Sequence, residues 1–220
     1  MQTFDTPAPV AAAFDIPAGR VQIIAADRAD TVVEIRPMDA SKSRDVKLAE
    51  QATVAYADGA LRVEVPVKNR HLGSSGAVEV TVRLPAGSRV EGKAAATEFR
   101  GVGRLGDVSF DGAYRKIKID EAASIRLTAV DGHVEVGRLN GPAEISTQRG
   151  DIRITEATRG AVVLSTQSGD ISVGAATGVS AALDAGTSYG RVSNGLRNDG
   201  TAVLSIRATT AHGDITARSL

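Results

Sequence analysis

Four short motifs in this sequence match motifs that carry chemistry in other proteins. Gly101-Val-Gly-Arg-Leu-Gly106 fits GxGxxG, a turn that brings a helix N-terminus to the pyrophosphate of a dinucleotide. Gly186-Thr-Ser-Tyr-Gly190 fits GxSxG, which presents a nucleophilic serine at the start of a helix, with His212 downstream. Asp107–Phe110 alternates as a strand, and no helical pattern follows Gly190. We therefore interpret both motifs as turns of a β-protein.

Two further motifs contain charged side chains. Arg149-Gly-Asp151 spells a tripeptide that some cell-surface receptors bind, and His133-Val-Glu135 has the HxE spacing of zinc deaminases. Those deaminases complete their zinc site with cysteines, and this sequence has none. Arg149 also stands where a similar segment has Ser168. We interpret the tripeptide as a coincidence within a repeated turn and the HxE motif as part of a strand.

A recurring pattern of Thr, Gly and Asp is more informative. A threonine lies three residues before a turn glycine, and in three copies an aspartate follows that glycine. In a stack of repeats the aspartates would form a column that could bind Ca²⁺, or the threonines and aspartates could cap turns by bonding backbone amides. His133 and Arg191 interrupt the column, so we favour capping and expect no metal, cofactor or catalytic residue. The structural positions are Thr147, Gly150, Asp151, Thr166, Gly169, Asp170, Thr187, Gly190, Thr210, Gly213 and Asp214.

The remaining candidate side chains suggest solvated surface. His71, His133 and His212 share no metal-ligand spacing. A locally basic run is balanced by nearby acids; its members are Arg100, Arg104, Arg115, Lys116 and Lys118, and the acids are Asp107, Asp111, Asp120 and Glu121.

The elements that would position these residues repeat from about residue 90 onward. The clearest copies are Ile145–Ile154 and Leu164–Val173, and a third, Thr210–Thr216, lies near the end of the sequence. Turn glycines recur every 18 to 23 residues, at Gly112, Gly132, Gly150, Gly169, Gly190 and Gly213. Apolar residues on either side alternate with polar ones, which indicates strands with one buried face. A coil of two strands cannot bury that face alone, so the pattern predicts a stacked β-solenoid.

The first 90 residues are β-rich but less regular. Strands are expected at 19–23, 31–35, 54–56, 61–65 and 77–84, with a hairpin turn at Ala57-Asp-Gly-Ala60. Residues 40–51 form either a loop or one short helix, and residues 66–76 form a mobile loop. We predict a β-rich part over 1–90, continuous with solenoid repeats over 91–220, as one elongated all-β domain.

Composition excludes several classes of protein. The 220 residues include no cysteine, carry a net charge of zero and contain 3% aromatic residues. These values argue against a disulfide framework, a nucleic-acid-binding surface and a sugar-stacking site. No basic residue precedes Arg20, and no run of 18 apolar residues occurs, so we expect neither a signal peptide nor a transmembrane segment. The expected location is cytoplasmic, although an export signal removed from a longer gene product stays open.

The Thr-x-x-Gly-Asp-Ile/Val repeats resemble a bacterial "putative adhesin" family with β-strand repeats, whose members are largely of unknown function. The matching segments are Thr147–Ile154, Thr166–Val173, Thr187–Val192, Thr210–Thr216 and, near the start, Ala18–Ile23. The resemblance covers most of the chain. It implies a right-handed β-helix-like fold and brings no catalytic residues with it.

Three classes of function remain, and a non-enzymatic one is favoured. The first is a non-catalytic interaction or scaffold protein of unknown ligand. The others are a surface adhesin exported by an unseen signal and a polysaccharide-active β-helix enzyme. The last repeat, Thr210–Thr216, is well formed although solenoids usually end in an atypical cap. We therefore expect that an N-terminal segment covers this end or that it docks a protein partner or a second copy.

Overall fold

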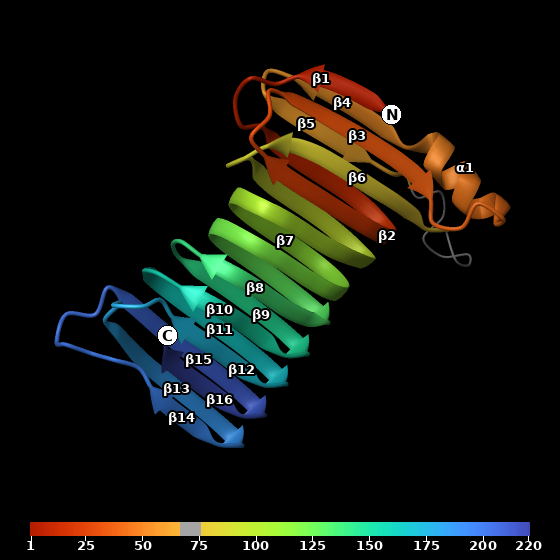
Figure 1. Cartoon of the computed structure of the whole chain (residues 1–220). Coiled ribbons are helices and arrows are strands. Elements are labelled where there is room, and N and C mark those ends of the chain that lie inside the picture. Colours follow the sequence, from red (N-terminus) through yellow and green to blue (C-terminus); the bar gives the residue numbers. More distant parts are fainter. Residues whose placement is uncertain (67–75) are drawn as a thin grey trace.

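In the computed structural model, which describes residues 1–66 and 76–220 apart from the side chains of residues 113–115, the chain winds into a stack of two-strand coils (Figure 1). The prediction of an all-β solenoid is confirmed. All the described strands belong to one hydrogen-bonded sheet, because two long strands continue from one wall of the stack to the other. The predicted loop at 66–76 falls largely on residues 67–75, which lie outside the described residues.

Each wall follows a continuous order of paired strands. The first wall runs β1 (Gln2–Asp5), β3 (Asp30–Pro37), β6 (Val78–Pro85), β2 (Ala11–Ala26), β7 (Arg89–Asp131), β8 (His133–Leu139), β10 (Ile152–Ala157), β12 (Ile171–Ala175), β16 (Ile215–Ser219) and β14 (Val192–Gly195). The second wall runs β4 (Thr53–Ala57), β5 (Ala60–Glu64), β2, β7, β9 (Ala143–Arg149), β11 (Gly160–Ser168), β15 (Leu204–His212) and β13 (Ala181–Tyr189). From β6 and β5 onward, neighbouring strands in both walls are parallel.

The core lies between the walls and is built from columns of aliphatic side chains. Parallel pairing in matching register at these positions places equivalent apolar residues directly above one another. One such column, each member at most 1% exposed, is Ile117, Val134, Ile152, Ile171 and Ile215. Burying a side chain of this size stabilises the fold by about 1.5–3 kcal/mol. The residues between them point outward, which explains the alternation seen in the sequence.

The corners of the coils bring backbone from adjacent coils very close together. Gly150 and Gly169 have φ angles of 129° and 150°, in the region that favours glycine. A Cβ atom on Gly169 would lie 2.2 Å from the carbonyl oxygen of Gly150. Positive φ and tight contact between coils therefore occur together at these glycines.

The N-terminal part adds antiparallel strands and a helix to the stack. β4 and β5 form the expected hairpin, and its turn residues Asp58 and Gly59 have φ angles of 50° and 77°. Residues 40–51 include a short helix, α1 (Ser43–Gln51), which buries Leu48 against the strands. β3 pairs antiparallel with both β1 and β6. Among the described residues, no helix is long and apolar enough to cross a membrane.

The spatial order of the last two coils is the reverse of their order in the sequence. β15 pairs with β11 on one side and β13 on the other, and β16 lies in the same way between β12 and β14. The last repeat in the sequence is therefore an inner coil, and β13 with β14 forms the end of the stack (Figure 1). The expectation that Thr210–Thr216 forms the end of the stack is wrong. The segment that covers it is residues 181–195, not an N-terminal segment.

The same arrangement occurs at the other end. β2 pairs with β7 on one side and with β5 and β6 on the other, although β5 and β6 follow it in the sequence. The segment Ala18–Ile23 thus belongs to an inner coil of the solenoid. At both ends of the stack, the repeat nearest the chain terminus is an inner coil. The strands that cover it come from a segment nearer the middle of the sequence.

Candidate functional site

The aspartates that follow the turn glycines form a hydrogen-bonded ladder between coils. The backbone N–H of Asp170 donates to Oδ1 of Asp151, and the N–H of Asp214 donates to Oδ1 of Asp170, both at 2.8 Å. The N–H of Arg191 continues the ladder by donating to Oδ1 of Asp214 at 2.8 Å. His133 stands at its start, because its Nδ1 accepts from the N–H of Asp151 at 3.1 Å. Each carboxylate thus caps an amide of the next coil rather than of its own turn.

This ladder gives a physical reason for the order of the coils. Each of the coils that contain Asp151, Asp170 and Asp214 accepts a hydrogen bond from the next coil at this position. Arg191 has a donor-only side chain, so it offers no acceptor to a further coil. The coil that contains Arg191 therefore suits the end of the stack, and the coil with the complete Thr-Gly-Asp motif suits an inner position.

The threonines behave differently from the expectation that they would bond turn amides. Their hydroxyls donate to backbone carbonyl oxygens, mostly of the turn glycine in the adjacent coil, because the hydroxyl points along the stack. The bonds run from Thr147 to Arg149 (3.1 Å), Thr166 to Gly150 (3.2 Å), Thr187 to Gly213 (3.0 Å) and Thr210 to Gly169 (3.0 Å). At the corners, the threonine hydroxyl thus bonds a backbone carbonyl oxygen and the aspartate carboxylate bonds a backbone N–H.

The ladder already explains the acids without a cation. Asp151 lies 3.3 Å from the imidazole of His133, and Asp214 lies 3.8 Å from the guanidinium of Arg191. No group of three potential metal ligands gathers anywhere in the part of the chain that the structure describes. The geometry of this column supports a structural role.

Replacing Asp170 with alanine should lower the free energy of unfolding by about 0.5–1.5 kcal/mol, because the N–H of Asp214 loses its acceptor. Asp170→Asn keeps a side-chain oxygen and should lose less. Asp184→Ala removes a surface ion pair with Arg207 and is the matched control, with an expected change near zero. Urea denaturation measures all three, with and without added Ca²⁺. A rise in stability of the native protein with sub-millimolar Ca²⁺ would contradict the capping role.

The structure places the catalytic-looking motifs in ordinary β-structure. Residues 101–106 lie within β7, and the strand continues through residues 107–110 with no helix. Residues 186–190 occupy the end of β13 and the turn after it, where Thr187 pairs with Thr210. Neither segment can present a helix N-terminus to a phosphate or a nucleophile to a base.

The charged motifs are engaged in structural contacts. Arg149 forms an ion pair with Asp131 at 3.1 Å, and Glu135 forms one with Lys118 at 2.9 Å. The hydrogen bond from Lys118 lowers the pKa of the Glu135 carboxyl. His212 stacks on Tyr189 with ring centroids 4.9 Å apart. In the basic run, Arg100 lies 2.7 Å from Asp120, which agrees with a balanced surface. His71 and the side chain of Arg115 lie outside the described residues.

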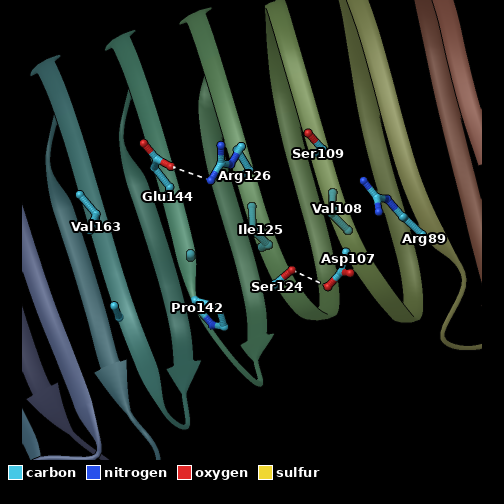
Figure 2. Close-up of a pocket in the computed structure, with 12 residues that line it drawn as sticks. Arg89, Asp107, Val108, Ser109, Ser124, Ile125, Arg126, Pro142, Glu144 and Val163 are labelled. Carbon is cyan, nitrogen blue, oxygen red and sulfur yellow. Dashed lines mark hydrogen bonds and ion pairs between the residues drawn. The ribbon is translucent and has the colours of Figure 1, made fainter.

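Sequence reasoning missed a hollow on the outer face of the second wall. It crosses β7, β9 and β11 (Figure 2). Its volume is about 570 Å³. We call it the wall groove, and its main lining residues are Arg89, Asp107, Ser109, Arg126, Glu144 and Val163. Two further hollows continue it toward β5. One shares Arg89 with the wall groove, the other shares Ser109 with it, and both are lined by Glu91. The outward alternation was visible in the sequence, but not which residues would meet across coils.

The charged side chains of the wall groove are paired with one another. Arg126 lies 3.4 Å from Glu144 on the next coil, and the hydroxyl of Ser124 donates to Asp107 at 2.6 Å (Figure 2). Small or apolar residues lie beside these pairs, including Ala161 and the 40%-exposed Val163. An extended molecule lying along the groove would therefore meet exchangeable ion pairs and shallow apolar positions.

The β13–β14 end of the stack is a second exposed feature. Val192 pairs with Ile215, and yet 46% of Val192 is exposed against 1% of Ile215. Leu183 and Ala185 are likewise only partly buried, although they belong to the core columns. These side chains are more exposed than their partners because no further coil packs on the outer side of β13 and β14 in the described chain.

Comparison with known proteins identifies the repeats. A model of the family described as Toastrack DUF4097 matches residues 14–218. Crystal structures to which the chain is similar include a "putative adhesin" from Bacteroides fragilis (13% identity, TM-score 0.48, covering 98% of this chain and 95% of that one) and a "putative cell adhesion protein" from Clostridium sporogenes (10%, 0.38, 100% and 98%). A third is a "putative adhesin" from Parabacteroides distasonis (12%, 0.34, 98% and 95%). No curated protein matches the chain.

Proposed function

We propose that this chain, which belongs to the Toastrack DUF4097 family, is a non-catalytic interaction protein that holds an extended segment of a partner protein in the wall groove. The observation that carries this proposal is the run of connected hollows across successive coils of one wall. A parallel stack holds such a surface rigid, because each coil is hydrogen-bonded to its neighbours along its length. Binding to a preformed surface avoids the entropic cost of ordering it.

The lining favours a polypeptide over a polysaccharide. Sugar-binding grooves offer exposed aromatic faces, and the aromatic residue among those that line these three hollows, Phe14, is 5% exposed. Glycoside cleavage uses two carboxyls placed for acid and base roles. Glu144 is held by Arg126 and Asp107 by Ser124, and no histidine lines these hollows among the described residues. These observations support a binding role without chemistry.

Filling the groove tests the proposal. The probe is a displayed library of random 12-residue peptides selected on the intact immobilised chain. Ala161→Trp places a large ring in the wall groove, and we expect it to weaken selected peptides at least about tenfold. Ser172→Trp adds the same ring to the outer face of β12, on the other wall, and should leave binding unchanged. Peptides that ignore Ala161→Trp, an empty selection, or binding to a glycan array instead would each overturn the assignment.

An adhesin role is the second candidate, because the structural relatives are described in those terms. It differs from the first in where the partner is met. The cytoplasmic location predicted from the sequence is therefore part of the proposal, because an adhesin would meet its partner at the cell surface. Fractionation of native cells, followed by immunodetection in the cytoplasm or at the surface, decides between the two.

The stack end is proposed as a separate contact surface. The sequence pointed to the last repeat as a place for a protein partner or self-association. Because β13 and β14 enclose that repeat, such a contact has to use residues 181–195.

A further inference from the structure

We infer that two copies of this chain associate end to end through β13 and β14, as a two-fold dimer in which both walls continue from one copy into the other. This inference extends the proposed interaction role, but it does not depend on the wall groove. It rests on three features of the β13–β14 end: open strand edges, incompletely covered core residues and balanced charge.

The strand edges at this end are open along most of their length. In the described chain, β13 pairs with β15 alone and β14 with β16 alone. Natural edge strands are usually blocked by lysine, proline or a bulge. β13 and β14 contain neither lysine nor proline, and the acid of β13, Asp184, is turned along the wall to Arg207 at 3.1 Å. The N–H of Ala181, at the start of β13, donates to the carbonyl oxygen of Arg197 at 2.9 Å, and the rest of the outer backbone of β13 can accept another strand.

The core at this end is partly exposed, whereas aromatic rings cover it at the other end. Val192 is 46% exposed, while Leu183 and Ala185 are only partly covered, with Leu196 of the following loop packed beside the core. At the β1–β4 end the rings of Phe4 and Tyr56 meet with centroids 5.3 Å apart. A contact that uses the open end of both copies closes after two molecules, whereas a head-to-tail contact would continue as a filament.

Charge and symmetry both allow a second copy as the occupant. The charged residues of the end coil and its loop are Arg191, Arg197, Asp184 and Asp199, two of each sign, so two such ends do not repel each other. Hydrogen bonding from Ser180 lowers the pKa of Asp199, which keeps that acid ionised. A two-fold axis at Ala185 pairs β13 with itself in antiparallel orientation. This axis sets Leu183 opposite Thr187 of the second copy. The core-facing sides of the two β13 strands then lie on the same side of the joined wall.

The contact is small, so the dimer should be weak. Two short strands offer less area than a standard interface of about 1,600 Å². We expect dissociation in roughly the micromolar range. Sedimentation velocity over a concentration series should show the mass of two chains at high concentration and no larger species. A monomer at every concentration, or a ladder of oligomers, would overturn the proposal.

Matched variants locate the contact. Val192→Lys puts a like charge into both copies at the proposed contact and should raise the dissociation constant at least about tenfold. Val130→Lys is the control, because Val130 is 43% exposed but lies in the middle of the stack. Thermal unfolding of a dilute, monomeric sample checks that both variants fold. Equal effects of the two substitutions on dimerisation would count against the assigned end.

A single thiol gives a readout of orientation. The chain has no cysteine, so Ala185→Cys and Val130→Cys each carry one reactive group. A short bismaleimide should link two copies through Cys at 185 but not at 130, because only the first position faces its own equivalent. Linking at neither position despite a dimeric mass would exclude this arrangement. None of these results depends on peptide binding, so failure here leaves the wall groove proposal to its own test.

Discussion

Deleting residues 204–220 is expected to destabilise the protein by about 5 kcal/mol or more, because it removes an inner coil and not the end of the stack. β15 and β16 supply the core residues Leu204, Ile206 and Ile215, each at most 1% exposed. They also supply every strand partner that β13 and β14 have in the described chain. The truncation therefore removes one coil and leaves a second without support.

Hydrogen exchange distinguishes this outcome from simple shortening. We expect amides of residues 181–195 to lose protection in the truncated chain, because their partners on β15 and β16 are gone. Deleting Met1–Asp5, which removes the largely exposed edge strand β1, is the control and should cost much less. The inner position of the last repeat would be refuted by a truncated chain that has the melting temperature of the full chain and still protects the amides of residues 181–195.

Substituting Gly169 with valine should cost about 3 kcal/mol, the second largest effect that the fold predicts. The residue has a φ of 150°, and its Cβ would lie 2.2 Å from the carbonyl oxygen and 2.5 Å from the carbonyl carbon of Gly150. Those atoms are backbone of the adjacent coil, so they cannot move aside without breaking the ladder around them. Backbone strain and overpacking each cost about 1–3 kcal/mol.

Two other glycines separate strain from collision. Gly178 has a φ of 78° but open space around its Cβ position, so Gly178→Ala should cost about 1 kcal/mol from strain alone. Gly186 lies outside the positive-φ region and also has open space, so Gly186→Ala should change stability by less than about 0.5 kcal/mol. Chemical denaturation of the three variants gives the series. Equal stability of Gly169→Val and Gly186→Ala would show that Gly169 is not a corner where two coils meet.

The local features of the fold were largely readable from the sequence. Period-two alternation around Gly150 and Gly169 predicted strands with one buried face, and the recurring glycines predicted the corners. The hairpin at Asp58 and Gly59 followed from turn chemistry alone. Such features depend on a few neighbouring residues, and the same residues decide them in any context.

The wall groove could not be predicted in this way. Its outward residues were identifiable by alternation, but Arg126 and Glu144 are 18 positions apart and meet only because two coils stack in one register. The threonine bonds were also misjudged, since the hydroxyl of Thr166 reaches a carbonyl oxygen that belongs to another coil. A contact between coils depends on which coil is the neighbour.

The sequence by itself determined the shape of each coil, because strand alternation and glycine corners are local properties of about 20 residues. Only the tertiary structure decided the order of the coils. The repeats share parallel edges but not identical columns, because β14 has Asn194 at the position that Ala217 and Val173 fill in the inner coils. An inner coil has to offer apolar residues and hydrogen-bond acceptors to a neighbour on each side, and the coil with Asp214 does so where the coil with Asn194 and Arg191 does not. That requirement places the last repeat inside the stack and leaves β13 and β14 at its open end.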